Sequence, residues 1–399
     1  MKYAGSGVAG RINWLVAFIL IVYPIILASM AFVYLRNRQF GIFELSMLLM
    51  GHYCTNISVG VGLHRLWAHG AFKTSKWVEW FLALFTAGVL QGPALMWASD
   101  HQRHHAYTDT ELDPHSPLKY KNRWLGFLWS HMGWMLIRSD FHIDTMTMRK
   151  LGKPGSPLLW QLKHYYKLAI FMNVVVPLVL GYLLTFSLQG AIAAYIFLGL
   201  GRAFQQHMTF CVNSLCHYLG ARKYTDGTAG DIWWMFFLLL GENWHNFHHA
   251  FARDYRNGWK WYQFDVHKWI IYAMSKLGLA WDLIKTPVAR IEAKEKEAQS
   301  RAISRLQANL KFIEAAAQRI ADGARSYVLN AEKSAHEIAE NVREKMKLLE
   351  SSALNLALKV RSYAAEMNIS DEIVMKANKK LRSIERLAES FGIVISGLK

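Results

Sequence analysis

The sequence predicts an all-α membrane protein with a separate, polar helical extension at its C-terminal end. Of the 399 residues, 53% are hydrophobic and only 19% are charged, whereas about 25% of an average soluble domain is charged. All 16 Trp, and every His except His336, lie before residue 282, and the rest of the chain is polar. We therefore predict a membrane domain over residues 1–289 and a helical tail over residues 290–399.

Five apolar stretches carry the membrane prediction, because a helix needs about 20 apolar residues to span a bilayer. They are residues 12–35, 40–63, 77–98, 168–188 and 190–212. Short links predict that the first two and the last two form antiparallel hairpins. Residues 232–240 are too few to span and predict a buried or interfacial helix.

The third stretch, residues 77–98, has histidine-rich sequence on both sides. If those histidines meet at one site, both flanks lie on one face of the membrane and the stretch cannot cross it. The sequence thus predicts four transmembrane helices, one non-spanning apolar helix and a helical cap. The cap segments carry most of the Lys and Arg of a chain with net charge +17, so we predict that the cap and both termini are cytoplasmic.

Histidine clusters are the main chemical signal in the predicted cap. They are HRLWAH (His64, His69), HQRHH (His101, His104, His105), NSLCH (Asn213, His217) and HNFHH (His245, His248, His249). Helical residues i, i+3 and i+4 share a face, so each HxxHH segment aims its imidazoles at one point, and Asn213 and His217 share a helix face in the same way. His64 and His69 are about 140° apart on an α-helix, so they need a helix end or a distortion, which Gly60 and Gly62 permit.

Nine clustered histidines and an asparagine exceed what one metal ion accepts, so the cap is predicted to hold a di-metal site. Imidazole suits iron, copper and zinc. The absence of thiolate ligands argues against structural zinc, and all-nitrogen ligation near lipid favours iron and O2 chemistry. Asp100 and Glu242 precede two clusters and are predicted to accept the second N–H of His101 and His245, with helix caps or solvated charges as the alternative. Isolated histidines such as His115 are predicted to be ordinary.

These motifs, in this order, closely resemble the membrane-bound fatty acid desaturases, specifically the bacterial form of the Δ9 (stearoyl-CoA desaturase-like) acyl desaturases. The resemblance covers about residues 12–285 and is supported by DPHSP at 113–117 and RNGWKWYQFD at 256–265. It implies two iron ions, O2 as co-substrate and formation of a cis double bond, at Δ9, in a saturated acyl chain. The implied iron ligands are His64, His69, His101, His104, His105, His217, His245, His248 and His249, with Asn213 acting through a water.

The resemblance also implies an acyl tunnel. The family bends its acyl chain beside a Trp, a Gln and a Thr, which match Trp97, Gln91 and Thr209. An interfacial aromatic anchor is the alternative for Trp97. Family residues that bind the CoA head group are not conserved at the matching positions, although Arg138 matches a basic contact. The substrate is therefore left open between acyl-CoA, acyl-lipid and acyl-carrier forms.

Electrons are predicted to come from a separate donor, ferredoxin or cytochrome b5 with its reductase, because neither a haem motif nor an iron–sulfur Cys run is present. A basic cytoplasmic face suits an acidic carrier. The bacterial inner (plasma) membrane is the predicted location, or the endoplasmic reticulum if the source is eukaryotic. No nucleic-acid partner is predicted, since no basic cluster accompanies a nucleic-acid motif.

The tail has apolar stripes at helical spacing over residues 303–320, 342–356 and 373–387, with breaks predicted at Gly323 and 368–370. It predicts an amphipathic bundle or coiled coil, with oligomerisation or partner binding as further roles. Two other functions stay open: a lipid hydroxylase of the same di-iron superfamily, and a catalytically silent metal-binding membrane scaffold that acts through the tail.

Overall fold

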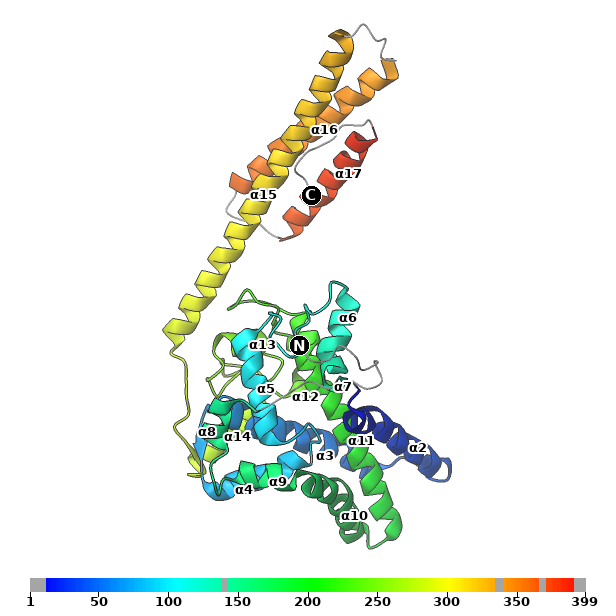
Figure 1. The fold of residues 1–399 in the computed structure, drawn as a ribbon, viewed down its shortest axis with the longest axis vertical. Coiled ribbons are helices and arrows are strands. Elements are labelled where there is room, and N and C mark those ends of the chain that lie inside the picture. The colour runs from blue at the N-terminus through cyan, green and yellow to red at the C-terminus, as the bar shows by residue number, and fades with distance from the viewer. Residues whose placement is uncertain (1–11, 138–142, 334–339, 366–370, 391–399) are drawn as a thin grey trace, which may run out of the picture. The chain divides into compact units, whose positions relative to one another are not determined.

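The computed structural model describes residues 12–137, 143–333, 340–365 and 371–390 (Figure 1). Arg138 and both chain termini lie outside the described residues. The chain divides into two compact units, Met1–Glu292 and Ala293–Lys399. The described part is mostly helical, and its one sheet pairs two short antiparallel strands, with Lys73 opposite Trp281 and Thr74 opposite Ala280.

The first half of the first unit contains most of the apolar sequence. In chain order its elements are α1 (Trp14–Ala17), η2 (Phe18–Val22), α2 (Tyr23–Arg36), α3 (Ile42–Ile57), η3 (Ser58–Ala68), β1 (Lys73–Thr74), α4 (Lys76–Ala87), α5 (Ala94–Tyr107), α6 (Arg123–Leu128), η4 (Trp129–Gly133), α7 (Trp134–Leu136) and α8 (Thr145–Leu151). Here η2, η3 and η4 are π-helical, with hydrogen bonds from residue i to i+5.

The second half of the first unit contains a helix that packs on α3, followed by the remaining segments of the predicted cap. Its elements are α9 (Pro157–Ile170), η5 (Phe171–Val175), α10 (Val176–Thr185), α11 (Leu188–Asn213), η6 (Leu215–His217), η7 (Trp233–Met235), α12 (Phe236–Leu239), α13 (His245–Ala250), α14 (Val266–Lys276) and β2 (Ala280–Trp281). Helix α11 packs on α2, α3 and α10. The predicted hairpins 12–63 and 168–212 therefore form one helical bundle. The predicted helix at 232–240 is a short 3₁₀ turn followed by α12.

Within the described residues, two helical segments are long and apolar enough to cross a membrane by length and composition, namely Trp14–Arg36 and Pro157–Thr185. The second begins earlier than predicted, because α9, η5 and α10 are continuous. The structure thus supports two of the four predicted spans by this criterion.

The stretch 77–98 is not the single helix that was predicted. The chain leaves α4 at Gly88 and begins α5 after Pro93, which is the N-cap of α5. Helix α4 has 12 residues and so is about 18 Å long, well short of the roughly 30 Å hydrocarbon core. This break agrees with the expectation that the stretch does not cross the membrane.

The second unit continues α15 (Val288–Lys333) and adds α16 (Glu340–Ala365) and α17 (Asp371–Glu389) (Figure 1). Their apolar stripes face one another around Ile313, Leu349 and Leu381, all of which are buried. The predicted break at Gly323 is wrong, because α15 continues through it. Ala321 and Ala324, beside that glycine, are buried in the same core, so packing outweighs the low helix propensity of glycine.

Candidate metal centre

His64 lies on the π-helix η3 and His69 is the C-cap of that helix, which agrees with the predicted helix end or distortion. The His69 N–H donates to the carbonyl oxygen of His64, five residues earlier, at 3.1 Å. This wider turn brings position i+5 close to the face of position i, and the two rings have centroids 4.9 Å apart. Gly60, in the same helix, has the His267 ring where a side chain would lie: a Cβ there would be 2.1 Å from His267 Cε1.

All nine clustered histidines come together between η3, α5, η6 and α13. Eight of them form two groups in which the four ring nitrogens lie within 4.8 Å of one another. The first group is His64, His69, His101 and His248, and the second is His104, His217, His245 and His249. His105 lies between the groups, since its Nε2 is 2.8 Å from that of His248 and its ring is stacked on His249.

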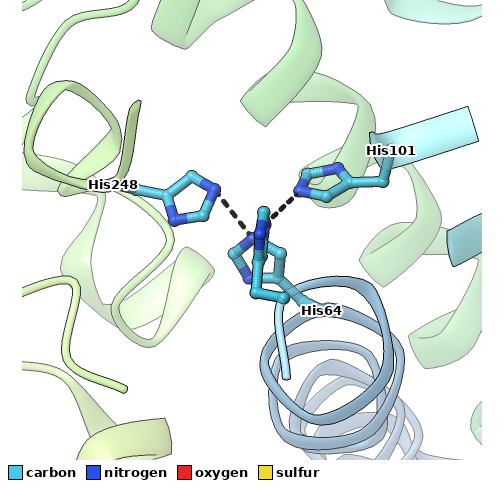
Figure 2. Close-up of side chains that lie close together, drawn as sticks. His64, His101 and His248 are labelled. Carbon is cyan, nitrogen blue, oxygen red and sulfur yellow. Dashed lines mark hydrogen bonds between the residues drawn. The ribbon is translucent and has the colours of Figure 1, made fainter. Parts of the chain in front are cut away.

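The spacing of the ring nitrogens suits shared metal ions. The Nε2 atoms of His64 and His248 are 3.0 Å apart, and those of His104 and His249 are 3.3 Å apart. Two imidazoles bound at right angles to one ion, with metal–nitrogen bonds of about 2.1 Å, have nitrogens about 3.0 Å apart. Figure 2 shows His64, His101 and His248 converging from three different segments on one point. The donor set therefore fits a pair of metal ions.

Glu242 orients one of these imidazoles by contacting the ring nitrogen that faces away from the group. Its Oε2 lies 2.8 Å from His64 Nδ1, so Nδ1 carries the proton and the Nε2 lone pair faces the group. The same carboxylate accepts hydrogen bonds from Arg65 Nη2 at 3.1 Å, His267 Nδ1 at 2.9 Å and Asn257 Nδ2 at 2.9 Å. Burial alone would raise the pKa of Glu242, but His64 and Arg65 hold it well below its ordinary value.

Two further carboxylates serve the second group. The Oδ1 atom of Asp113 lies 3.0 Å from His104 Nδ1. Asp109 accepts a hydrogen bond from the Thr228 hydroxyl, whose oxygen lies 2.7 Å from His217 Nδ1. These contacts orient His104 and His217 so that Nε2 points to the group in both residues.

The segment NSLCH is not the continuous helix that the i, i+4 spacing predicted. Helix α11 ends at Asn213, and His217 ends the 3₁₀ turn η6. His217 still reaches the second group, with its Nε2 3.0 Å from that of His245. Asp231 Oδ1 accepts hydrogen bonds from the N–H groups of Asn246 and Phe247 and so holds the first turn of α13 in place.

Burial favours the neutral form of His101, His104, His245 and His249, which is the form that binds metals. It lowers the pKa of His245 to about 3 and holds the pKa values of His101, His104 and His249 well below the ordinary value. Neighbouring histidines lower the values further.

An apolar cavity opens beside the first group. Its walls include Val59, Val212 and Leu239, and Asn56 and Asn213 contribute polar atoms. The cavity also borders three clustered histidines and two of the predicted tunnel residues, namely His64, His101, His245, Trp97 and Thr209. Asn213 thus lies at the cavity wall beside the histidines.

The three predicted tunnel residues contact one another. Trp97 Nε1 donates to Gln91 Oε1 at 3.3 Å, and Gln91 Nε2 donates to Thr209 Oγ1 at 3.3 Å. The Trp97 ring is stacked on His101, with centroids 4.9 Å apart. A chain in the cavity would therefore lie beside both Trp97 and the first histidine group.

The family model described as fatty acid desaturase matches residues 40–282, which include every clustered histidine. The chain belongs to the fatty acid desaturase family. The prediction from the histidine motifs is thereby confirmed.

Three curated relatives illustrate the similarity of this desaturase. A probable acyl-CoA desaturase of Schizosaccharomyces pombe is 32% identical over 305 residues, covering 76% of this chain and 61% of the relative. Acyl-CoA desaturase 1 of Saccharomyces cerevisiae is 35% identical over 259 residues, covering 64% and 49%. The sn-1 stearoyl-lipid 9-desaturase of Anabaena variabilis is 34% identical over 236 residues, covering 58% and 80%. The chain thus spans about half to three fifths of the two yeast relatives.

Two carboxylates of this desaturase lie differently from the expected arrangement. Glu242 contacts His64 and not His245, the histidine that follows it. Asp100 does not orient His101 in the expected way: its Oδ1 is buried without a hydrogen-bond partner among the described residues, and burial raises its pKa to about 8.

Two histidines that were predicted to be ordinary belong to the site. His267 donates to Glu242. The ring centroid of His115 lies 4.2 Å from that of His104, and one potential ligand atom from each of His115, His104 and Asp113 lies within 4.8 Å of the others. The DPHSP motif, which contains His115, was the available signal.

Proposed function

We propose that this chain is a di-iron acyl desaturase that uses O2 and two electrons to introduce a cis double bond, at Δ9, into a saturated fatty acyl chain. Support comes from the relatives, whose names describe acyl-CoA and acyl-lipid desaturases. The single observation that carries the proposal is the apolar cavity that places Trp97 and Thr209 beside two groups of buried imidazoles.

The nine histidines are the proposed iron ligands, and Asn213 is proposed to act through a water. Iron bound there would supply the O2-dependent oxidation of unactivated C–H bonds. The reaction removes one hydrogen from each of two adjacent methylenes and reduces O2 to two waters. It therefore consumes two electrons and two protons from outside the acyl chain.

Protein side chains would set which methylenes react. The apolar walls exclude water, and the linked side chains of Gln91, Trp97 and Thr209 fix the surface on which the acyl chain bends. Since Trp97 is stacked on His101, the bend lies next to the first histidine group. The acyl carrier is left open between CoA, a carrier protein and a phospholipid.

Four helical segments are proposed to span the membrane: Trp14–Arg36, α3 with η3, Pro157–Thr185 and α11. Support comes from large apolar side chains on their outer surfaces, with Phe32, Ile42 and Leu183 all more than half exposed. A soluble protein rarely exposes so much apolar surface. The histidines and both termini then share the cytoplasmic side of a bacterial inner membrane, or of the endoplasmic reticulum.

Expression in a desaturase-deficient host, with fatty acids analysed by mass spectrometry, tests the proposal. A new monoene should appear with the wild-type chain and disappear with His64→Ala. The matched control is His164→Ala, since the His164 ring contacts the Trp160 carbonyl and ring and belongs to neither histidine group. Hydroxy-acyl products would support a lipid hydroxylase. An iron-loaded protein that forms neither product when supplied with electrons would refute both enzymes and support a scaffold.

The tail is proposed to mediate oligomerisation or partner binding. Its apolar stripes are buried within the second unit, so it contributes a stable helical bundle. A chain that lacks residues 300–399 should keep acyl chemistry and lose partner binding or self-association, measured by light scattering. Loss of desaturation in that variant would contradict the proposal.

A further inference from the structure

The desaturase function proposed above requires an electron entry point. Each turnover needs two electrons from outside, and the sequence has only three Cys and no iron–sulfur or haem motif. The inference below rests on the proposed function and concerns the surface through which those electrons arrive.

A second cleft opens on the first unit, and it shares no lining residue with the apolar cavity. His217 and Thr228 are among its lining residues, together with Lys121, Arg123 and Arg222. Of the described residues that line it, none is acidic. The centre is thus approached by an apolar cavity at the first histidine group and by a cationic cleft at the second.

His217 connects the cleft to the second group. It is buried, its Nδ1 lies 2.7 Å from the Thr228 hydroxyl oxygen, and its Nε2 is 3.0 Å from His245 Nε2. A redox group bound over the cleft would therefore be separated from the second group by the His217 ring, without the acyl cavity intervening.

The three cations are exposed and surround this entrance. Lys121 and Arg123 belong to the segment before and at the start of α6, and Arg222 lies in the loop after η6. The Tyr218 hydroxyl donates to the Arg123 carbonyl at 2.8 Å, and the Arg123 guanidinium lies over the Tyr218 ring. This contact ties the α6 wall to the η6 wall and holds the cleft in shape.

We propose that this cleft is the docking site of an acidic one-electron carrier protein, whose electrons enter the second histidine group through His217. Positive charge around a cleft steers an acidic partner and raises its association rate by about 10-fold to 1,000-fold at low salt. The acyl substrate uses the other opening, so carrier and substrate can be bound together.

The test uses the full-length, iron-loaded protein in detergent and a reduced, acidic [2Fe–2S] ferredoxin as the probe. Charge reversal by Lys121→Glu with Arg222→Glu should lower the second-order rate of electron transfer about 10-fold at low salt. The difference should vanish near 1 M salt, where the Debye length is about 3 Å. The matched control is Lys153→Glu, an exposed residue after α8 that does not line the cleft; its rate should equal that of the wild type.

Chemical reduction supplies electrons without a carrier protein, so it tests the acyl chemistry independently of the docking site. After reduction by dithionite and addition of O2, wild type and variants should form equal amounts of monoene in a single turnover. No product from the wild type would refute the proposed function. Equal ferredoxin rates in wild type and charge-reversed protein would refute the docking site alone. If the double variant does not fold, the single variant Arg222→Gln is used instead. Its rate of electron transfer from ferredoxin should be about two- to threefold lower than that of the wild type. An unchanged rate would refute the docking site.

A lipid headgroup is the competing ligand for a cationic cleft. Binding of each variant to vesicles with and without anionic phospholipid distinguishes the two. Weaker vesicle binding with an unchanged ferredoxin rate would overturn the proposal, whereas a lower ferredoxin rate with unchanged vesicle binding supports it.

Discussion

Glu242→Gln should weaken metal binding at the histidine centre without changing the shape of the side chain. The carboxylate has contacts on both oxygens: Arg65 and His267 at Oε1, and His64 and Asn257 at Oε2. A glutamine has only one carbonyl oxygen. In either orientation its NH2 group faces two donors, so two of the four contacts are lost and the charge that partly balances Arg65 disappears.

The expected magnitude follows from those contacts. Hydrogen bonds to a charged group each contribute about 1.5–3 kcal/mol, and removing one partner of a buried ion pair costs about 3–5 kcal/mol. Because Arg65 keeps a second partner, Asp265 at 3.0 Å, we expect a loss of about 3–5 kcal/mol in the free energy of unfolding. Loss of the group that orients His64 should weaken metal affinity about 10- to 100-fold.

Iron per chain, measured by mass spectrometry after equilibration with a metal buffer, gives the affinity, and Trp fluorescence during heating gives Tm. The matched control is Glu297→Gln, an exposed carboxylate paired with Lys294 and Arg301, whose loss should leave Tm and iron content nearly unchanged. Wild-type iron affinity and Tm in Glu242→Gln would refute the argument that Glu242 positions His64.

Three further outcomes are expected. Gly60→Ala should lower Tm and iron content, because its Cβ would lie 2.1 Å from His267, whereas the nearest atom to a Cβ at Gly62 is 3.3 Å away; equal effects of Gly60→Ala and Gly62→Ala would contradict this. Ile291→Ala should lower the free energy of unfolding by about 2–5 kcal/mol, because Ile291 is fully buried and packs with Phe247 of α13. Val288→Ala, at a half-exposed position, should leave Tm nearly unchanged. Equal Tm values for the two variants would count against this packing. Iron-free protein should lose stability as the pH falls below about 6.5, since burial lowers the pKa values of His248 and His249 and these residues then take up protons only in the unfolded chain. A Tm that does not change between about pH 7 and pH 5 would oppose that reasoning.

Local spacing predicted the parts of the site that one helix creates. The HxxHH segments lie on α5 and α13 as expected, and the five-residue separation of His64 and His69 indicated the distorted turn that η3 supplies. These inferences succeed because the geometry of a helix fixes which neighbours share a face.

Contacts between residues far apart in the sequence could not be predicted from helix geometry. Glu242 was paired with the nearby His245, but it contacts His64 and Arg65, and Arg65 is 177 residues away in sequence. His267 was predicted to be ordinary, yet it reaches Glu242 because α14 packs on η3 at Gly60. The break between α4 and α5 was also missed, although Pro93 stands at its end, directly before α5.

The order in which the chain is made gives the histidine centre a further property. His64 and His248, whose Nε2 atoms are 3.0 Å apart, are separated by 184 residues, and α13 is covered by Ile291 still later in the chain. Histidines made early must therefore wait for most of the domain to be synthesised and inserted. Such distant pairings form slowly. Metal delivery in the cell is thus a late step, and a nascent chain cut before residue 249 should leave the ribosome without a complete centre.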